Sequence, residues 1–386
     1  MALFPDIPRD FGFGEEHALL RDQARRFLAE RSSPKEVRRL AEDPLGHDPD
    51  VWKEMAGLGW TGLVLPEEHG GAGLGALHLA LLLEEMGRAL LPSPFLATLL
   101  GGLALERAGS EAQRARWCPA LAAGETIASF AFAEPDGSWE PEHVAATAEP
   151  AGDGFTLRGV KAYVPAAPSA GLVLAPFRIA GGREDGALAL FAVELPAGGV
   201  RVEPEVGVDP TRRAGRIAFD GARVAAGARL PGDGARALRH VYRWGWTALA
   251  AEMVGGAEAT LAMTRDYAIA RVQFGRQIGS FQAVKHPLVD VMIAVETART
   301  LALAAAAALD HAPDQAEVPA RMAKAAAGDA FAFAADRAIQ LHGGYGFTWD
   351  CDAHFYFKRA LWARGTLGDA VHHRRHLADL LIGRLE

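Results

Sequence analysis

A long helical segment in the C-terminal part constrains the fold of this chain more than any other feature. Residues Ala235 to Arg271 have the alanine-rich composition of one helix, although Gly255-Gly256 stands in its interior. A second apolar run, to about Leu309, follows Pro287, which stands where a helix tolerates proline in its first turn. A third helix is predicted from Pro319 to about Leu341. Long helices joined by short loops favour an antiparallel bundle.

The rest of the chain changes its pattern twice. Up to about Gly124, leucine and methionine recur at helix spacing, which predicts a helical N-terminal part. Between about Thr126 and Leu230, short stretches that alternate apolar and polar residues are broken by Gly, Pro and Asp, which predicts antiparallel strands. We therefore expect a mainly α fold with a central β domain. The predicted domains are residues 1–125 (helical), 126–232 (β) and 233–386 (helical bundle).

Charge and cysteine content exclude several classes of function. The chain has 386 residues and a formal net charge of -8, the wrong sign for a nucleic-acid partner or for attraction to an anionic membrane. The run from Leu301 to Leu309 is too short to span a bilayer. Cys118 and Cys351 lie far apart and form no disulfide or zinc pattern, and the first residues do not resemble a signal peptide. We therefore expect a cytoplasmic protein.

Two loops beside the predicted helices carry residues suited to a bound cofactor. The segment Arg271 to His286 offers an arginine, glutamines, an aromatic ring and glycines, and the arginine fork suits a pyrophosphate. The segment Gln340 to Phe347 has three glycines in four positions, which lets a ligand or another backbone approach closely. The alternative for both is an ordinary turn after a helix.

Three other patterns have a structural interpretation that we favour over a functional one. The glycines from Gly70 to Gly75 resemble a phosphate loop, but no strand precedes them, so we expect a loop that leads into a helix. His372 and His376 stand four residues apart without an adjacent glutamate, so we expect a solvated helix face and no metal. Small charge pairs such as Arg25-Arg26 do not form a basic surface.

In this order, the two loops resemble the acyl-CoA dehydrogenase family. The pattern R-x-Q-F-G-x-x-I-x-x-F-Q-x-x-x-H begins at Arg271, and Q-x-x-G-G-x-G-F begins at Gln340. Further similarities lie in Pro66 to Gly71 and Glu84 to Arg88, then in the middle of the chain. Those middle matches are Ala133-Glu134-Pro135 and Gly159-Val160-Lys161-Ala162-Tyr163, so the resemblance covers nearly the whole chain.

The resemblance implies a C-terminal four-helix bundle and FAD bound between that bundle and the β domain, with a second subunit completing the site. It implies that Arg271 contacts the pyrophosphate across a dimer interface, with Gln273 and Phe274 beside it and Gln282 in the same motif. Gln340, Gly343 and Gly344 are expected to hold the adenosine half. The residues expected to line the flavin ring are Phe130, Phe132, Ala133 and Tyr163, which stands in place of the usual tryptophan.

The implied reaction is α,β-dehydrogenation of an acyl-CoA thioester, with an electron-transfer flavoprotein as acceptor, and it needs a carboxylate base. Here the sequence departs from the family. The usual base position falls at Leu367, and the alternative position on the long helix falls at Gly245. Glu252 and Asp369 are the candidate substitutes. Pro165 also replaces the threonine that bonds the flavin edge.

These departures do not touch the motifs that are expected to anchor FAD. The chain resembles the companion subunits of actinobacterial α2β2 acyl-CoA dehydrogenases, which act on bulky CoA esters such as steroid side-chain thioesters. We expect a homo- or hetero-oligomer, a dimer or a tetramer. The alternatives are a non-catalytic subunit that holds FAD, and a flavin monooxygenase or oxidase on the same scaffold.

Overall fold

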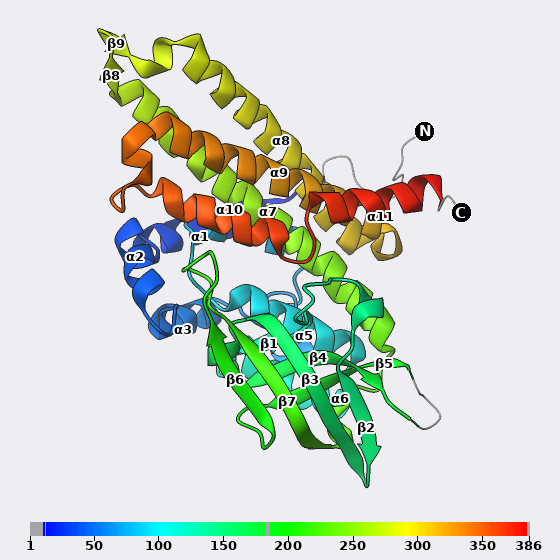
Figure 1. Cartoon of the computed structure of the whole chain (residues 1–386). Helices are drawn as coiled ribbons and strands as arrows, with labels where there is room; N and C mark the ends of the chain where they lie inside the picture. Colours follow the sequence, from blue (N-terminus) through cyan, green and yellow to red (C-terminus); the bar gives the residue numbers. More distant parts are fainter. Residues whose placement is uncertain (1–10, 12, 182–185, 384–386) are drawn as a thin grey trace. The chain divides into compact units, whose positions relative to one another are not determined.

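The computed structural model describes residues 11, 13–181 and 186–383, which form two compact units. The helical unit comprises the described residues of Met1–Arg39, Gly75–Leu91 and Arg243–Glu386, and the sheet unit comprises those of Leu40–Leu74 and Pro92–Tyr242. The predicted order of helices, then strands, then helices is confirmed (Figure 1). The predicted bounds of the three domains stay a prediction.

Long helices dominate the helical unit, and Figure 1 shows α7 to α10 side by side. The α-helices that lie wholly or partly in this unit are α1 (Glu15–Arg31), α2 (Pro34–Glu42), α4 (Ala76–Arg88), α7 (Gly234–Ala270), α8 (Gln282–His311), α9 (Glu317–His342), α10 (Ala353–Gly365) and α11 (Ala370–Ile382). The predicted single helix from Ala235 to Arg271 is therefore confirmed, as is the expectation that the Gly70–Gly75 loop leads into a helix.

The start of α8 differs from the expectation. The helix begins at Gln282, so Pro287 lies inside it and not in its first turn. Proline has no N–H, and Ala283 therefore lacks the hydrogen bond that residue 287 would donate in a regular helix. The helix tolerates this loss near an exposed N-terminal end, where carbonyl groups can reach water.

The glycine pair inside α7 permits close contact with two other helices. A Cβ atom on Gly255 would overlap the carbonyl oxygen of Glu84 in α4, and a Cβ atom on Gly87 in α4 would overlap the carbonyl oxygen of Glu252. Gly256 faces α9, where a Cβ atom would lie 2.6 Å from the ring of Phe331. The glycines thus let α4 and α7 approach backbone to backbone.

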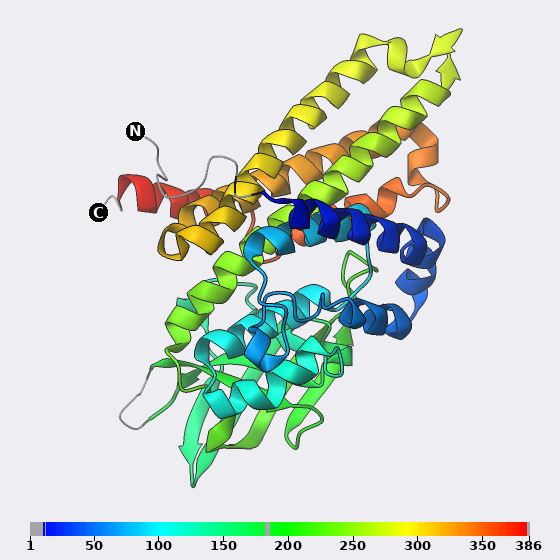
Figure 2. The same cartoon turned by 180° about the vertical axis from the view of Figure 1, so that it is seen from behind.

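The sheet unit holds one seven-stranded sheet and the remaining α-helices. The helices are α3 (Pro49–Gly57), α5 (Phe95–Ala108) and α6 (Glu111–Ala122). The strands are β1 (Ala128–Phe130), β2 (Thr147–Ala151), β3 (Gly154–Pro165), β4 (Leu172–Ile179), β5 (Leu188–Glu194), β6 (Val200–Glu205) and β7 (Ala214–Ala225). Their order is β1-β4-β2-β3-β7-β6, with β5 also paired to β4. Helix α5 packs on β1 and β4, on the face seen in Figure 2.

Short 3-10 helices complete the chain in both units. They are η1 (Glu67–His69), η2 (Pro141–His143), η3 (Ala167–Ser169), η4 (Ala226–Ala228), η5 (Ile278–Ser280), η6 (Pro313–Gln315) and η7 (Gly343–Phe347).

Most strand pairs are antiparallel as predicted, but β4 has two parallel neighbours. Strand β1 pairs with Leu172–Leu174 and β2 pairs with Arg178–Ile179, while β5 pairs along Leu172–Arg178. Because β5 occupies one edge of β4, β1 and β2 share the other edge at different heights. The chain therefore leaves β1, makes an excursion over residues 131–146, and rejoins the same edge in the same direction.

Among the described residues, α8 is the helix that is long and apolar enough by length and composition to cross a membrane. Its C-terminal half is buried within the protein, since Ala302 and the residues from Ala305 to Leu309 are all covered. Its N-terminal half exposes Val289, Met292 and Ile293. The apolar character of α8 is therefore partly that of a core helix.

Candidate cofactor site

The two motif loops lie together at one end of the helical unit. Helix α7 ends at Ala270 and continues into a hairpin of β8 (Val272–Gln273) and β9 (Arg276–Gln277), labelled in Figure 1. An open cavity of about 680 Å³ lies between this hairpin and the end of α9. The cavity is lined by Tyr267, Arg271, Gln273, Ile278, Gln340, Leu341, His342, Gly343, Gly344 and Tyr345.

Local interactions fix the wall formed by the end of α9. Gly343 has φ 61°, which ends the helix, and a Cβ atom on Gly343 or Gly344 would meet only open space. The ring of Tyr267 stacks on His342 with 4.3 Å between centroids, and the His342 Nδ1 atom lies 2.8 Å from the carbonyl oxygen of Ala338. Burial lowers the pKa of His342, which favours a neutral imidazole that packs on the ring of Tyr267. Motif reasoning missed Tyr267 and His342.

The cavity suits the phosphate and adenosine part of a dinucleotide. Arg271 and Gln273 are exposed on the hairpin, and Gln340 supplies an amide on the opposite wall. A planar guanidinium binds phosphate oxygens through paired donors, and the open backbone at Gly343 and Gly344 lets a ligand approach closely. The residues present thus fit the FAD contacts that the resemblance implies. Phe274, 90% exposed, and Gln282 lie outside the lining of this cavity.

The residues expected around the flavin ring lie in the sheet unit. Phe130, Phe132 and Ala133 are buried, and Phe132 packs on Trp139 and Tyr242 with ring centroids 6.0 and 5.2 Å apart. Tyr163 is different, because it is 59% exposed and has φ 54° at an irregularity in the pairing of β3 with β7. The Tyr163 side chain is thus available to a ligand, whereas the side chains of Phe130, Phe132 and Ala133 pack inside the sheet unit.

Leu367, at the usual base position, lies in the short loop between α10 and α11. It is only 3% exposed and has φ 58°, a conformation that costs energy for a residue other than glycine. The Trp246 indole nitrogen donates to the Leu367 carbonyl oxygen at 2.9 Å. Lys324 Nζ donates to the carbonyl oxygens of Arg364 and Gly368 at 3.1 and 2.8 Å. The loop and the end of α10 are therefore fastened to α7 and α9 through three backbone carbonyls.

The same loop is surrounded by buried basic and aromatic side chains. Burial lowers the pKa of Lys324 to about 7 and that of His373 to about 2. The His373 ring meets Trp246 edge to face at 5.2 Å, and the Arg321 guanidinium lies 4.1 Å from the centre of the Trp246 ring. Gly245, at the alternative base position, is buried beside Trp246. Neither base position offers a carboxylate.

The two candidate substitute carboxylates have other structural roles. Glu252 is 2% exposed and forms an ion pair with the equally buried Arg359 at 2.6 Å, joining α7 to α10. Asp369 caps α11, because its carboxylate accepts the backbone N–H of His372 at 2.8 Å. These contacts argue against a catalytic role for either side chain.

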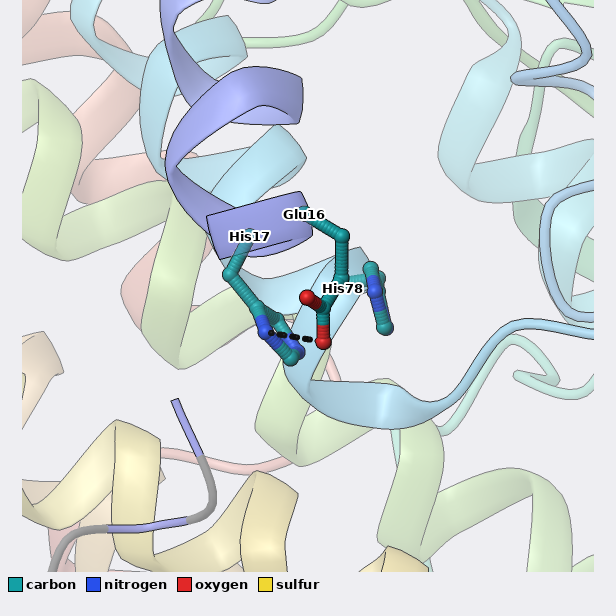
Figure 3. Close-up of side chains that lie close together, drawn as sticks. All are labelled: Glu16, His17 and His78. Atoms are coloured by element: carbon teal, nitrogen blue, oxygen red, sulfur yellow. Dashed lines mark ion pairs between the residues drawn. The ribbon is translucent and has the colours of Figure 1, made fainter. Parts of the chain in front are cut away.

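A histidine cluster elsewhere in the helical unit has some metal-ligand character. Glu16 and His17 at the start of α1 lie next to His78 in α4 (Figure 3). The two imidazole rings are stacked, with 3.9 Å between centroids and 26° between planes. The nitrogen lone pairs of stacked rings lie in nearly parallel planes, which is a poor arrangement for two ligands of one ion. His17 Nδ1 also accepts the backbone N–H of Gly14 at 3.0 Å, so the cluster is an interhelical contact.

Comparisons with known proteins agree with the fold. Residues 14–125 match the family model "Acyl-CoA dehydrogenase, N-terminal domain", and residues 232–382 match "Acyl-CoA dehydrogenase, C-terminal domain". The acyl-CoA dehydrogenase IpdE2 of Mycobacterium tuberculosis is 33% identical over 347 residues, which cover 90% of this chain and 91% of the relative.

Two solved structures carry the comparison further. A variant of the Tcur3481-Tcur3483 steroid ACAD is similar with a TM-score of 0.85 and 33% identity, covering 96% of this chain and 98% of that one. The ChsE4-ChsE5 complex of Mycobacterium tuberculosis is similar with a TM-score of 0.88 and 27% identity, covering 98% of this chain and 100% of that one. This chain therefore belongs to the acyl-CoA dehydrogenase family of FAD-dependent oxidoreductases.

Proposed function

We propose that this chain is the FAD-holding subunit of a hetero-oligomeric acyl-CoA dehydrogenase whose partner subunit supplies the catalytic carboxylate. One observation carries the proposal. The loop with Leu367 at the base position is buried and fastened to the bundle, while the cavity beside Arg271 and Gln340 keeps the groups that suit a dinucleotide. The chain is thus better equipped to bind the flavin than to remove a proton.

In this family, bound FAD provides the acceptor for the hydride that leaves the β-carbon of an acyl-CoA thioester. We assign to Arg271 the binding of the pyrophosphate, and to Gln340, Gly343 and Gly344 the binding of the adenosine half. Tyr163 and the buried Phe130, Phe132 and Ala133 are assigned to the flavin ring. Removal of the α-proton needs a desolvated carboxylate near the substrate, and we assign that group to the partner subunit.

Exposed apolar side chains support an assembly of more than one subunit. Val289, Met292 and Ile293 share one face of α8 at positions i, i+3 and i+4, and each is about half exposed. Ile269 and Phe274 add apolar surface at the hairpin end. A contiguous apolar face on a water-soluble protein marks an interaction surface. We assign this face to contacts between subunits of a dimer or tetramer.

The substrate class and the electron acceptor extend the same proposal. The Tcur3481-Tcur3483 relative is a steroid ACAD, which favours a bulky polycyclic CoA ester as the substrate of the assembly. An electron-transfer flavoprotein is the proposed acceptor, and the cytoplasm is the proposed location. An oxidase or monooxygenase on the same scaffold is the competing function, because the chain lacks the base.

The test is to purify the full chain alone and together with an acyl-CoA dehydrogenase subunit that carries the family glutamate. We expect a hetero-oligomer by native mass spectrometry, bound FAD by visible absorption, and anaerobic bleaching by an acyl-CoA only when both subunits are present. Replacement of the partner glutamate should abolish bleaching and leave FAD content unchanged. Bleaching by the chain alone, or hydrogen peroxide formation without bleaching, would overturn the proposal.

A further inference from the structure

A buried ion pair in the sheet unit joins the two segments that we assign to the flavin ring. Lys161 in β3 is 0% exposed, and its Nζ atom lies 2.7 Å from the Glu134 carboxylate. The ring of Phe177 lies beneath the ammonium group, at 5.4 Å. Burial lowers the pKa of Lys161 to about 8, although the Glu134 charge opposes this shift. The pair therefore holds a cation where the protein interior disfavours one.

The Glu134 carboxylate also joins the two ends of the segment that connects β1 to β2. Besides Lys161, it accepts the backbone N–H groups of Ala145 and Ala146 at 2.9 and 3.1 Å. Three donors on one carboxylate satisfy most of its hydrogen-bonding capacity. Because residues 134 and 145 lie at the two ends of this excursion, the side chain fixes its shape from inside.

Three contacts join residues 129–134 to residues 161–165 in reverse order. The Ser129 hydroxyl donates to the Pro165 carbonyl oxygen, the Ala162 N–H donates to the Ala133 carbonyl oxygen at 2.8 Å, and Lys161 donates to Glu134. The residues assigned to the flavin, namely Phe130, Phe132, Ala133 and Tyr163, all lie between the outer two contacts. The ion pair is thus one of the two outer contacts that bound this group of residues.

We propose that Glu134 and Lys161 are positioning residues for FAD, which hold segment 130–133 and Tyr163 in the register that receives the flavin ring. A well-packed apolar pair of similar volume often stabilises a fold as well as a buried ion pair does, so stability alone does not account for these charges. A directional charged contact fixes one register, whereas apolar side chains can slide. This inference rests on the proposed flavin role of the two segments.

The first test measures positioning without the cofactor. Lys161→Met and the double variant Glu134→Gln/Lys161→Met are compared with the wild type by hydrogen–deuterium exchange of the FAD-free full chain. We expect about tenfold faster exchange in residues 129–146 and 161–166 together, with β5 unchanged. The control is Arg201→Met, which breaks an exposed pair with Glu203 on β6. Wild-type exchange rates in the double variant would overturn the proposal.

The second test measures FAD in the assembled protein. Both variants should retain FAD about tenfold more weakly and show a less resolved flavin absorption band, even where the double variant regains the wild-type melting temperature. A merely structural pair would lose stability and FAD together, and the double variant would restore both. If the wild type bound no FAD with any partner, the proposed function would fail while the exchange result still decided the register.

Discussion

The Trp246 indole nitrogen donates a 2.9 Å hydrogen bond to the Leu367 carbonyl oxygen. Trp246 follows Gly245 in α7, so this contact joins the two places at which the family resemblance puts a catalytic base. Both places are buried, and Lys324 fastens the loop a second time. We therefore expect that a carboxylate side chain placed at either position will not by itself restore a catalytic base.

Leu367→Glu should therefore destabilise the protein without creating dehydrogenase activity in the isolated chain. A carboxylate at a buried site costs roughly 2–4 kcal/mol of unfolding free energy, measurable by urea denaturation. Leu361→Glu, at a half-exposed site in α10, is the matched control and should change stability little. Anaerobic flavin bleaching by Leu367→Glu alone would show that the loop can open and that our interpretation is wrong.

Replacing Glu252 distinguishes a structural ion pair from a catalytic base. Glu252→Gln should lower the unfolding free energy by about 3–5 kcal/mol, because the buried Arg359 would lose the charge of the carboxylate that lies 2.6 Å from it. The double variant Glu252→Leu/Arg359→Met should recover much of that loss and leave bleaching by the assembled enzyme intact. A stable Glu252→Gln variant that binds FAD but does not bleach would instead identify Glu252 as the base.

The guanidinium group of Arg271 is expected to retain FAD. Arg271→Ala should release FAD during gel filtration, and Arg271→Lys should give an intermediate content, because lysine keeps the charge but loses the paired donors. Arg265→Ala, an exposed arginine in α7 that pairs with Asp266, serves as control. FAD content equal to wild type in Arg271→Ala contradicts the pyrophosphate assignment.

Lys324 predicts a particular dependence of stability on pH. Its pKa is about 7 in the folded chain and returns to its ordinary value of 10.5 on unfolding. Between these values the unfolded chain binds one more proton, so the unfolding free energy rises with pH. It falls as the pH drops towards 7. Urea denaturation from pH 7 to 10 should show a steeper rise for the wild type than for Lys324→Met, and parallel curves would mean that Lys324 stays charged in the folded chain.

The apolar face of α8 is expected to hold subunits together. Ile293→Asp should shift the oligomer towards smaller species by native mass spectrometry, because a charge in an apolar interface loses hydration without gaining a partner. Leu19→Asp, at a more exposed site on α1, should leave the assembly unchanged. An intact oligomer in Ile293→Asp would place the subunit contact elsewhere.

Local patterns predicted much of the fold. The helix from Gly234 to Ala270 was predicted because its signals, an alanine-rich composition and a long uninterrupted segment, lie in consecutive residues. The parallel strands β1 and β2 were not, because β1 has three residues and no alternation, and β2 contains Pro150. Their direction depends on β4, which lies farther along the chain.

The site divides in the same way. The motifs predicted that Arg271 and Gln340 belong together, and the cavity at the end of α9 contains both. The contacts that fasten the loop at Leu367 and the pair of Glu134 with Lys161 were not predicted. Buried polar groups bond to residues that are far away in the sequence, as Trp246 does to Leu367. No local sequence pattern predicts such contacts.

The close approach of Gly87 to the α7 backbone and of Gly255 to the α4 backbone has a consequence for recombination between relatives. The two glycines stand far apart in the sequence, yet each leaves room for the other helix. A chimera joined near residue 125 would inherit them from different parents. If one parent carried a larger residue at either position, the helices could not meet, although each parental half was sound. Such a chimera should fold only when it contains both glycines or both of their replacements.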